Sequence, residues 1–149
     1  MDSTNSFLSF LIDNEYFAVN VENVLEVLLK PRISRIPNVP SEIKGVTNFR
    51  GEIIPVFETR ICFGMPDKEK LDKYVILVLE VIINGNKTNV GAIADKVKEV
   101  FEVDNQLIQA IPEMTTKARK EMITGIYKTK NDFVILIDAN KIFVWEDNH

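Results

Sequence analysis

The chain has 149 residues, 46% of them hydrophobic, and its formal net charge is −4. A chain of this size and apolar content can bury one core or two small, closely joined cores, so we do not expect disorder. The acidic balance argues against nucleic acid as the main partner, because binding to phosphates needs a surplus of Lys and Arg.

The first predicted element is a β-hairpin near the N-terminus. Residues 7–12 and 16–19 have strand-like composition, and Asp13-Asn14-Glu15 supplies the turn between them. Residues 21–29 carry apolar side chains at helical spacing but are rich in valine, so the pattern also suits a strand. We expect a short helical turn followed by a strand.

A proline-bounded loop and a second hairpin come next. Pro37 and Pro40 hold residues 33–39 extended, so the loop should present Ile33 and Ile36 in fixed positions. A one-turn helix is expected at 41–44. Residues 46–49 and 52–57 form the hairpin strands, reversed at Arg50-Gly51 because glycine accepts positive φ without steric cost. Pro55 should lie at an edge or a bulge, and a short helix should follow Glu58 and stop before Gly64.

The second half of the chain starts with its most apolar run, residues 74–83. This run has about half the ~20 residues of a membrane helix, so it predicts a strand buried on both faces of a soluble protein. Asn84-Gly85-Asn86 is a strong hairpin signal, and residues 87–94 return. Residues 95–103 could form a strand or a helix, and residues 108–114 form a second proline-containing loop.

Residues 43–63 and 123–143 have the same pattern without a gap, at an offset of 80 residues, from 125 − 45. Gly45 falls on Gly125, Gly51 on Asn131, and Glu58 on Asp138. Glycine and asparagine most readily accept the left-handed conformation, so we expect equivalent turns at 51 and 131. Residues 24–27 resemble 97–100 at an offset of 73. Two related β halves explain this repeat; the alternative is chance similarity between strand–turn–strand segments.

The sequence gives little support to catalysis. The only histidine is the last residue, His149; a catalytic base must be held within hydrogen-bond reach of its substrate, and a terminal residue is rarely held in place. Cys62 lies in an apolar segment and is expected to be a core residue; as the only cysteine it excludes a multi-thiolate metal site. The turn aspartates, including Asp13, are explained by local hydrogen bonding. We expect no metal and no cofactor.

Glu26 is the carboxylate that stands out. It lies between Val24, Leu25 and Val27, where a charge would need a cationic partner. Arg50, at the tip of an otherwise apolar hairpin, is the partner that we expect; the alternative is that both side chains are solvated. Two adjacent β units would also leave a crevice between them, rimmed by apolar loop residues.

These segments resemble the CheW family of chemotaxis coupling proteins. The likeness covers residues 10–27, 33–40, 45–63, 90–100 and 123–143 in the family's order, and Gly-Val-Thr-Asn-Phe-Arg-Gly-Glu-Ile-Ile-Pro-Val is close to its most diagnostic stretch. Phe49 replaces the usual Leu, Glu58-Thr59 the usual Asp-Leu, and Ala94 the usual Val. These substitutions affect at most the fine preference for partners.

The resemblance implies a mainly β fold of two interlocked five-stranded SH3-like β-barrels with a few short helices. It implies a single domain over residues 7–145, with intertwined subdomains at approximately 15–72 and 73–145 and the N-terminal strand pairing across. It also implies a non-enzymatic adaptor, cytoplasmic and monomeric when isolated, without membrane insertion.

The resemblance implies two partners: the cytoplasmic tip of a chemoreceptor and the regulatory domain of the histidine kinase CheA, joined in arrays under the membrane. Carried over by position, the receptor surface comprises Val24, Glu26, Gly45, Arg50, Gly51, Val75 and Ile76. The kinase contacts comprise Ile33, Ile36, Glu113 and Met114.

Two alternatives remain at this point. A CheW-like coupler could serve a surface-motility or developmental pathway rather than a flagellar one. From a different class, a small β-barrel could bind single-stranded nucleic acid, which would require aromatic platforms in a basic groove.

Overall fold

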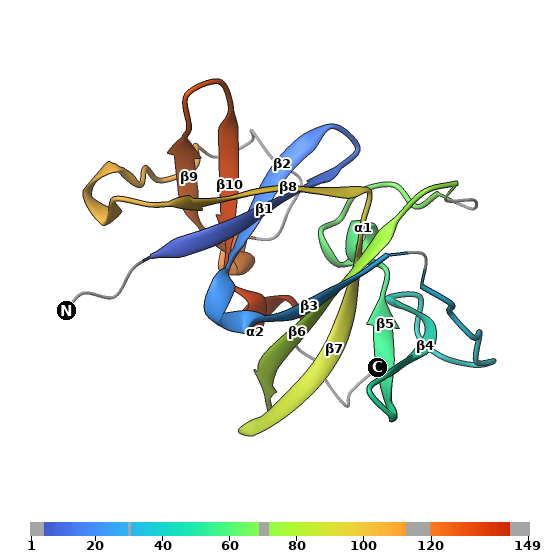
Figure 1. The fold of residues 1–149 in the computed structure, drawn as a ribbon. Helices are drawn as coiled ribbons and strands as arrows, with labels where there is room; N and C mark the ends of the chain where they lie inside the picture. Colours follow the sequence, from blue (N-terminus) through green and yellow to red (C-terminus); the bar gives the residue numbers. More distant parts are fainter. Residues whose placement is uncertain (1–4, 30, 69–71, 113–119, 144–149) are drawn as a thin grey trace.

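The computed structural model describes residues 5–29, 31–68, 72–112 and 120–143. Strands dominate this part of the chain, and the helices are single turns (Figure 1). The strands are β1 (Ser6–Ile12), β2 (Glu15–Asn20), β3 (Val24–Leu29), β4 (Ile43–Phe49), β5 (Glu52–Phe57), β6 (Val75–Ile83), β7 (Asn86–Ala94), β8 (Lys96–Glu102), β9 (Ile123–Lys128) and β10 (Phe133–Ile137). The helical turns are η1 (Val21–Asn23), α1 (Thr59–Cys62), η2 (Asn105–Leu107), η3 (Lys120–Met122) and α2 (Ala139–Ile142).

The strands form two five-stranded sheets, which confirms the predicted mainly β, double-barrel fold. The orders are β8-β1-β2-β10-β9 in the first sheet and β3-β6-β7-β5-β4 in the second. Figure 1 shows the first sheet at the upper left and the second at the lower right. The N-terminal hairpin therefore joins strands from the end of the chain, while β6 and β7 join β3 to β5.

Each sheet thus draws strands from both sides of residue 72. Two strands at the N-terminus, rather than one, pair across, so the sheets do not coincide with the segments 15–72 and 73–145. That division into subdomains stays a prediction.

The two sheets repeat the same construction. In each, one parallel pair joins the halves, Val56 with Gly91 in the second sheet and Leu136 with Ala18 in the first. These pairs preserve the offsets of 80, from 136 − 56, and 73, from 91 − 18. The register also shifts after Ile43 and after Ile123, at equivalent positions. The internal repeat is therefore built into the backbone.

Alternating side chains of the apolar strands fill three cores. One core lies inside each sheet, and a larger one lies between the sheets. In β6, Ile76 and Val78 pack inside the second sheet, whereas Leu77, Leu79 and Val81 pack against the first. Because successive side chains point to opposite faces, the apolar run is buried on both sides, as predicted.

Several local expectations are settled by the backbone. The turn η1 followed by β3 is as predicted, and β8 decides the open assignment of residues 95–103 in favour of a strand. The one-turn helix at 41–44 is wrong, because Ile43 N–H donates to Pro40 at 3.0 Å in a turn and β4 already begins at Ile43. Pro55 does not lie on an edge strand; β5 is internal, and its pairing with β7 starts only at Val56.

Within the described ranges, no helix is both long and apolar enough to span a bilayer.

Candidate protein-binding site

The ion pair expected from the sequence is present at the open side of the second sheet. Arg50 Nη2 lies 2.9 Å from Glu26 Oε1, with side-chain exposures of 70% and 40%. Glu26 is on β3, and Arg50 follows β4; β3 and β4 are the two edge strands of this sheet. The contact therefore brings the two edges together across the barrel. It is exposed rather than buried, so it contributes little to stability and leaves charged groups open to a partner.

The turn that carries Arg50 requires a left-handed backbone conformation at two residues. Arg50 and Gly51 both have positive φ, 52° and 85°, the pattern of a type I′ hairpin turn. Asn48 Oδ1 accepts the Gly51 N–H at 3.1 Å, and the Arg50 guanidinium lies 4.9 Å from the ring centre of Phe49. These contacts hold the arginine over the hairpin and toward β3.

Gly45 fixes the proline-bounded loop against this hairpin. Ser34 and Val46 exchange two backbone hydrogen bonds of 2.8 and 2.9 Å beside it. A Cβ atom on Gly45 would overlap the Ser34 carbonyl oxygen and lie 2.9 Å from Ile33 Cγ2. Glycine at this position allows the loop to approach the strand closely.

An apolar hollow of about 560 Å³ lies where β3 ends and β6 begins. Val75 is the one receptor-surface residue from the sequence prediction that lines it. The other lining residues were not anticipated: Leu29, Pro31, Asp72, Lys73 and Tyr74. Leu29 is 75% exposed on this edge strand, and no pattern in the sequence distinguished it.

The predicted receptor residues divide into exposed and buried groups. Glu26, Arg50 and Gly51 reach the surface, and Val24 and Val75 are half-buried. Ile76 is fully buried and Gly45 is buried under the loop. In this conformation these two can only support the surface from below.

The predicted kinase-binding residues also differ in their exposure to solvent. Ile36 is 42% exposed on the proline-bounded loop, whereas Ile33 packs partly against the core inside the second sheet. The expectation that the loop presents both isoleucines therefore holds in full only for Ile36. Glu113 and Met114 lie outside the described residues.

The sequence interpretation missed a buried arginine where the two sheets meet. Arg60 on α1 has no exposed surface, and its Nη2 lies 2.8 Å from Asp13 and 2.6 Å from Asp95. Asp13 was assigned to local turn bonding, which is wrong for its side chain: its carboxylate binds an arginine 47 residues away. The signal available was Arg60 itself, a charged residue within an otherwise apolar segment.

The contacts within this cluster shift the pKa values of two of its ionisable side chains. Hydrogen bonds from Arg60 hold the pKa of Asp13 below its ordinary value. Burial alone would lower the pKa of Arg60, but its hydrogen bonds to Asp13 and Asp95 raise it. Burial raises the pKa of the neighbouring Glu58, whose Oε2 lies 3.8 Å from Lys44 Nζ. The cluster therefore joins the two sheets.

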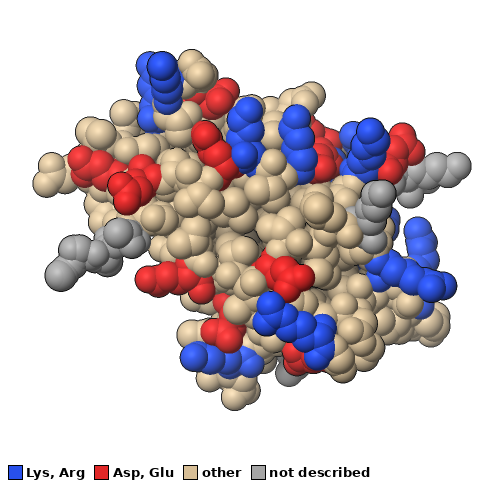
Figure 2. All heavy atoms as spheres, viewed as in Figure 1, with Lys and Arg blue, Asp and Glu red and all other residues tan. Residues whose placement is uncertain are grey.

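The remaining candidate reactive groups are Cys62 and clusters of metal-ligating side chains. Cys62 is buried in the core between the sheets, as expected of a packing residue. Among these residues no three His, Cys, Asp or Glu side chains are grouped to hold a metal ion. Figure 2 shows acidic and basic side chains interspersed on the visible face, without the continuous basic stripe that a nucleic-acid groove would need.

Comparison with known proteins gives a consistent result. The CheW-like domain family matches residues 6–147. The chain is 30% identical over 141 residues to the chemotaxis protein CheW of Klebsiella aerogenes, covering 95% of this chain and 82% of that protein. It is also 30% identical over 133 residues to CheW of Bacillus subtilis, covering 89% and 83%. The crystal structure of the scaffolding protein TtCheW from Thermoanaerobacter tengcongensis superposes with a TM-score of 0.80 at 29% identity, covering 98% and 92%.

Proposed function

This chain belongs to the CheW family of chemotaxis scaffolds, and we propose that it is a non-enzymatic adaptor that couples chemoreceptors to the histidine kinase CheA. The observation that carries the proposal is the family match over residues 6–147 on a fold shared with a solved CheW scaffold. It would act in the cytoplasm, in arrays held by membrane receptors.

The receptor side of the proposal is the surface around the Glu26–Arg50 pair and the hollow beside Val75. The hollow has apolar walls from Leu29, Pro31 and Tyr74, and the exposed Glu26–Arg50 pair supplies charge on the same sheet. Such a surface suits the apolar face of a helix with polar residues along its margin. The tip of a chemoreceptor, a helical hairpin, is the partner that we assign to it.

The kinase side of the proposal is the proline-bounded loop with Ile36 exposed and Ile33 supporting it. A rigid body with two contact surfaces raises the effective concentration of receptor and kinase for one another, even if each contact is weak. A change in how the receptor sits would reach the kinase as a coupling free energy, typically about 1–3 kcal/mol.

Charge reversal at Arg50 tests the receptor surface. Arg50→Glu would place two carboxylates together at the site, so we expect receptor binding to weaken about tenfold or more. The fold should persist, because Arg50 is largely exposed. Binding and activity are measured by co-sedimentation with a receptor cytoplasmic fragment and by receptor-dependent CheA autophosphorylation.

Lys130→Glu is the matched control, because Lys130 occupies the position of Arg50 in the other hairpin, at 130 − 50 = 80 residues. It should leave both measurements unchanged. Normal kinase activation by Arg50→Glu would contradict the receptor assignment, and failure of the parent chain to bring receptor and CheA into one complex would contradict the proposed function.

A further inference from the structure

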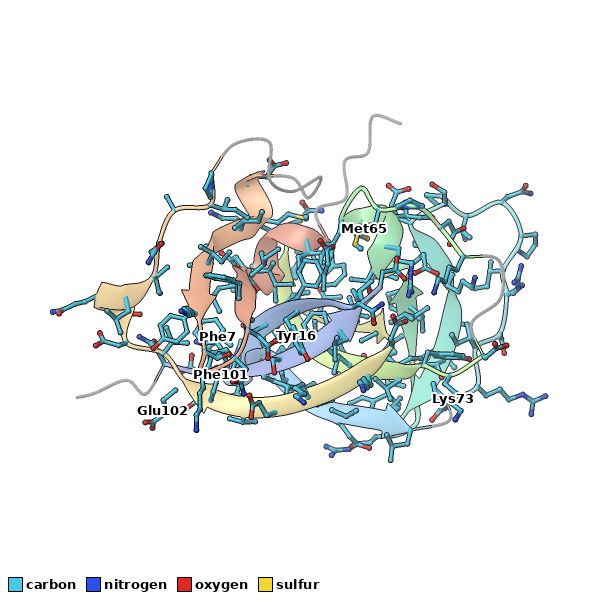
Figure 3. All side chains as sticks on the ribbon, turned by 90° about the horizontal axis from the view of Figure 1, so that it is seen from above. Phe7, Tyr16, Met65, Lys73, Phe101 and Glu102 are labelled. Carbon is cyan, nitrogen blue, oxygen red and sulfur yellow. The ribbon has the colours of Figure 1, made fainter. Side chains whose placement is uncertain are left out.

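The apolar hollow lies at one end of the second sheet, and the first sheet has an equivalent end. Leu29, the last residue of the edge strand β3, pairs with Val75, the first residue of β6. In the first sheet Glu102, the last residue of the edge strand β8, pairs with Ser6, the first residue of β1. Leu29 and Glu102 are also related by the repeat offset of 73, from 102 − 29. Figure 3 shows Glu102 and Lys73, which lines the hollow, at opposite ends of the molecule.

The two equivalent ends carry opposite kinds of side chain. The terminal pair of β3 and β6 is apolar, whereas the terminal pair of β8 and β1 is polar. Two residues further on, Pro31 lines the hollow, whereas its counterpart Asp104 accepts a backbone N–H at the start of η2. The fold therefore accepts a charged residue at the end of this edge strand, so folding does not require leucine at position 29. A leucine that is 75% exposed within a continuous apolar hollow is typical of a binding surface.

The walls next to Leu29 are formed before any partner arrives. The half-buried Tyr74 packs against the core inside the second sheet, and its hydroxyl lies 3.4 Å from the Pro31 carbonyl oxygen. The ring of Pro31 also fixes its own φ. A preformed wall reduces the entropy that a partner must lose on binding. Leu29 is open to solvent, so a partner that covers it removes apolar surface from water.

We propose that Leu29 is the main anchor of the receptor surface, an inference that rests on the proposed function. An apolar side chain of the receptor tip enters the hollow and covers Leu29 beside Tyr74 and Val75. Such a buried apolar contact determines how long the complex lasts. The exposed Glu26–Arg50 pair instead steers the association of the two proteins.

The test measures the association and dissociation rate constants of a receptor cytoplasmic fragment by surface plasmon resonance. Leu29→Gln keeps an unbranched neutral side chain of similar length, and it should raise the dissociation rate constant about tenfold or more. The association rate constant should change by less than about threefold. Raising the ionic strength should slow the association of the parent and leave its dissociation unchanged.

Ile82→Gln is the matched control. Ile82 is 51% exposed near the other end of β6 and does not line the hollow, so this variant should bind the receptor fragment like the parent. Both variants should bind the regulatory domain of CheA normally. Parental dissociation of Leu29→Gln, equal weakening by Ile82→Gln, or a loss of CheA binding in place of receptor binding would each overturn this inference alone. A parent chain that does not bind the receptor fragment would instead contradict the proposed function.

Discussion

The helical turns α1 and α2 occupy equivalent places after β5 and β10, but they hold the two sheets together by different interactions. Arg60 on α1 reaches the β1–β2 turn of the other sheet through a buried ion pair with Asp13 at 2.8 Å. Asn140 on α2 reaches the end of β6, also in the other sheet, through a hydrogen bond to Ile82 N–H at 2.9 Å. The repeat thus fixes where each helix meets its neighbour, whereas single side chains decide whether that junction is ionic or neutral.

Of the changes that test this comparison, removal of Arg60 should reduce the unfolding free energy most. Arg60→Met keeps an unbranched, flexible side chain but removes the guanidinium and leaves Asp13 and Asp95 without their arginine, which should cost about 3 kcal/mol of unfolding free energy. Asn140→Ala removes one hydrogen bond and should cost about 1 kcal/mol. Urea unfolding of both variants measures the difference.

Neutralising the partner acids provides the control for Arg60. Adding Asp13→Asn and Asp95→Asn to Arg60→Met should recover part of the lost stability, because no unpaired charge then remains. If Arg60→Met were no more destabilising than Asn140→Ala, the ionic junction would be energetically equivalent to the neutral one.

The second contrast concerns the two equivalent glycines. A Cβ on Gly45 would meet the Ser34 carbonyl, a backbone atom, whereas a Cβ on Gly125 would first meet the Ile108 side chain and then Gln109 O at 2.8 Å. Gly45→Ala should therefore cost about 2–3 kcal/mol, and Gly125→Ala about 1–2 kcal/mol, since a side chain can shift more easily than a backbone. Thermal unfolding measures the costs, and amide exchange at Ser34 should rise only in the Gly45 variant. Equal protection of Ser34 in both variants would contradict this reason.

The third contrast concerns the hairpin turns. Gly51 has positive φ, but Asn131 does not; its loop closes by mutual hydrogen bonds between Thr129 and Asp132. The predicted equivalence of the two turns is therefore wrong. Gly51→Val should cost about 1–2 kcal/mol through backbone strain alone, because nothing lies within 4 Å of its Cβ position. Asn131→Val should change the stability by no more than about 0.5 kcal/mol. An unchanged melting temperature for Gly51→Val would show that the chain relaxes the turn.

The smallest expected effect is a pH dependence of the unfolding free energy that comes from Glu58. Burial raises the pKa of Glu58 above its ordinary value of 4.5. Because the folded protein then holds this proton more tightly than the unfolded chain, the contribution of Glu58 is fully present below 4.5 and is lost as pH rises through the raised pKa. Glu58→Gln should remove that decline. Chemical denaturation of parent and variant from pH 4 upward measures it, and parallel profiles would count against it.

What the sequence could predict depended on distance along the chain. The Arg50–Gly51 turn and the alternation in β6 are local, and both were predictable from residue type and spacing. The Glu26–Arg50 pair was predictable because each charge stood alone in an apolar segment. The role of Asp13 was not, since an aspartate at a turn has a sufficient local explanation and its partner lies on another sheet. Burial of Ile76 followed from the predicted strand buried on both faces, and it conflicts with the place of Ile76 on the receptor surface, which came from the resemblance alone.

Each sheet contains a hairpin from the other half of the chain, β1–β2 in the first sheet and β6–β7 in the second. This arrangement has a consequence for folding during synthesis. Phe7 on β1 pairs with Phe101 on β8, so β1, which pairs with β2 on its other side, lacks this second neighbour until about two thirds of the chain has left the ribosome. Such distant pairing slows folding and leaves a hydrophobic hairpin waiting during synthesis. Cutting the chain once therefore cannot release either sheet as an independent module, because each contains strands from before and after residue 72.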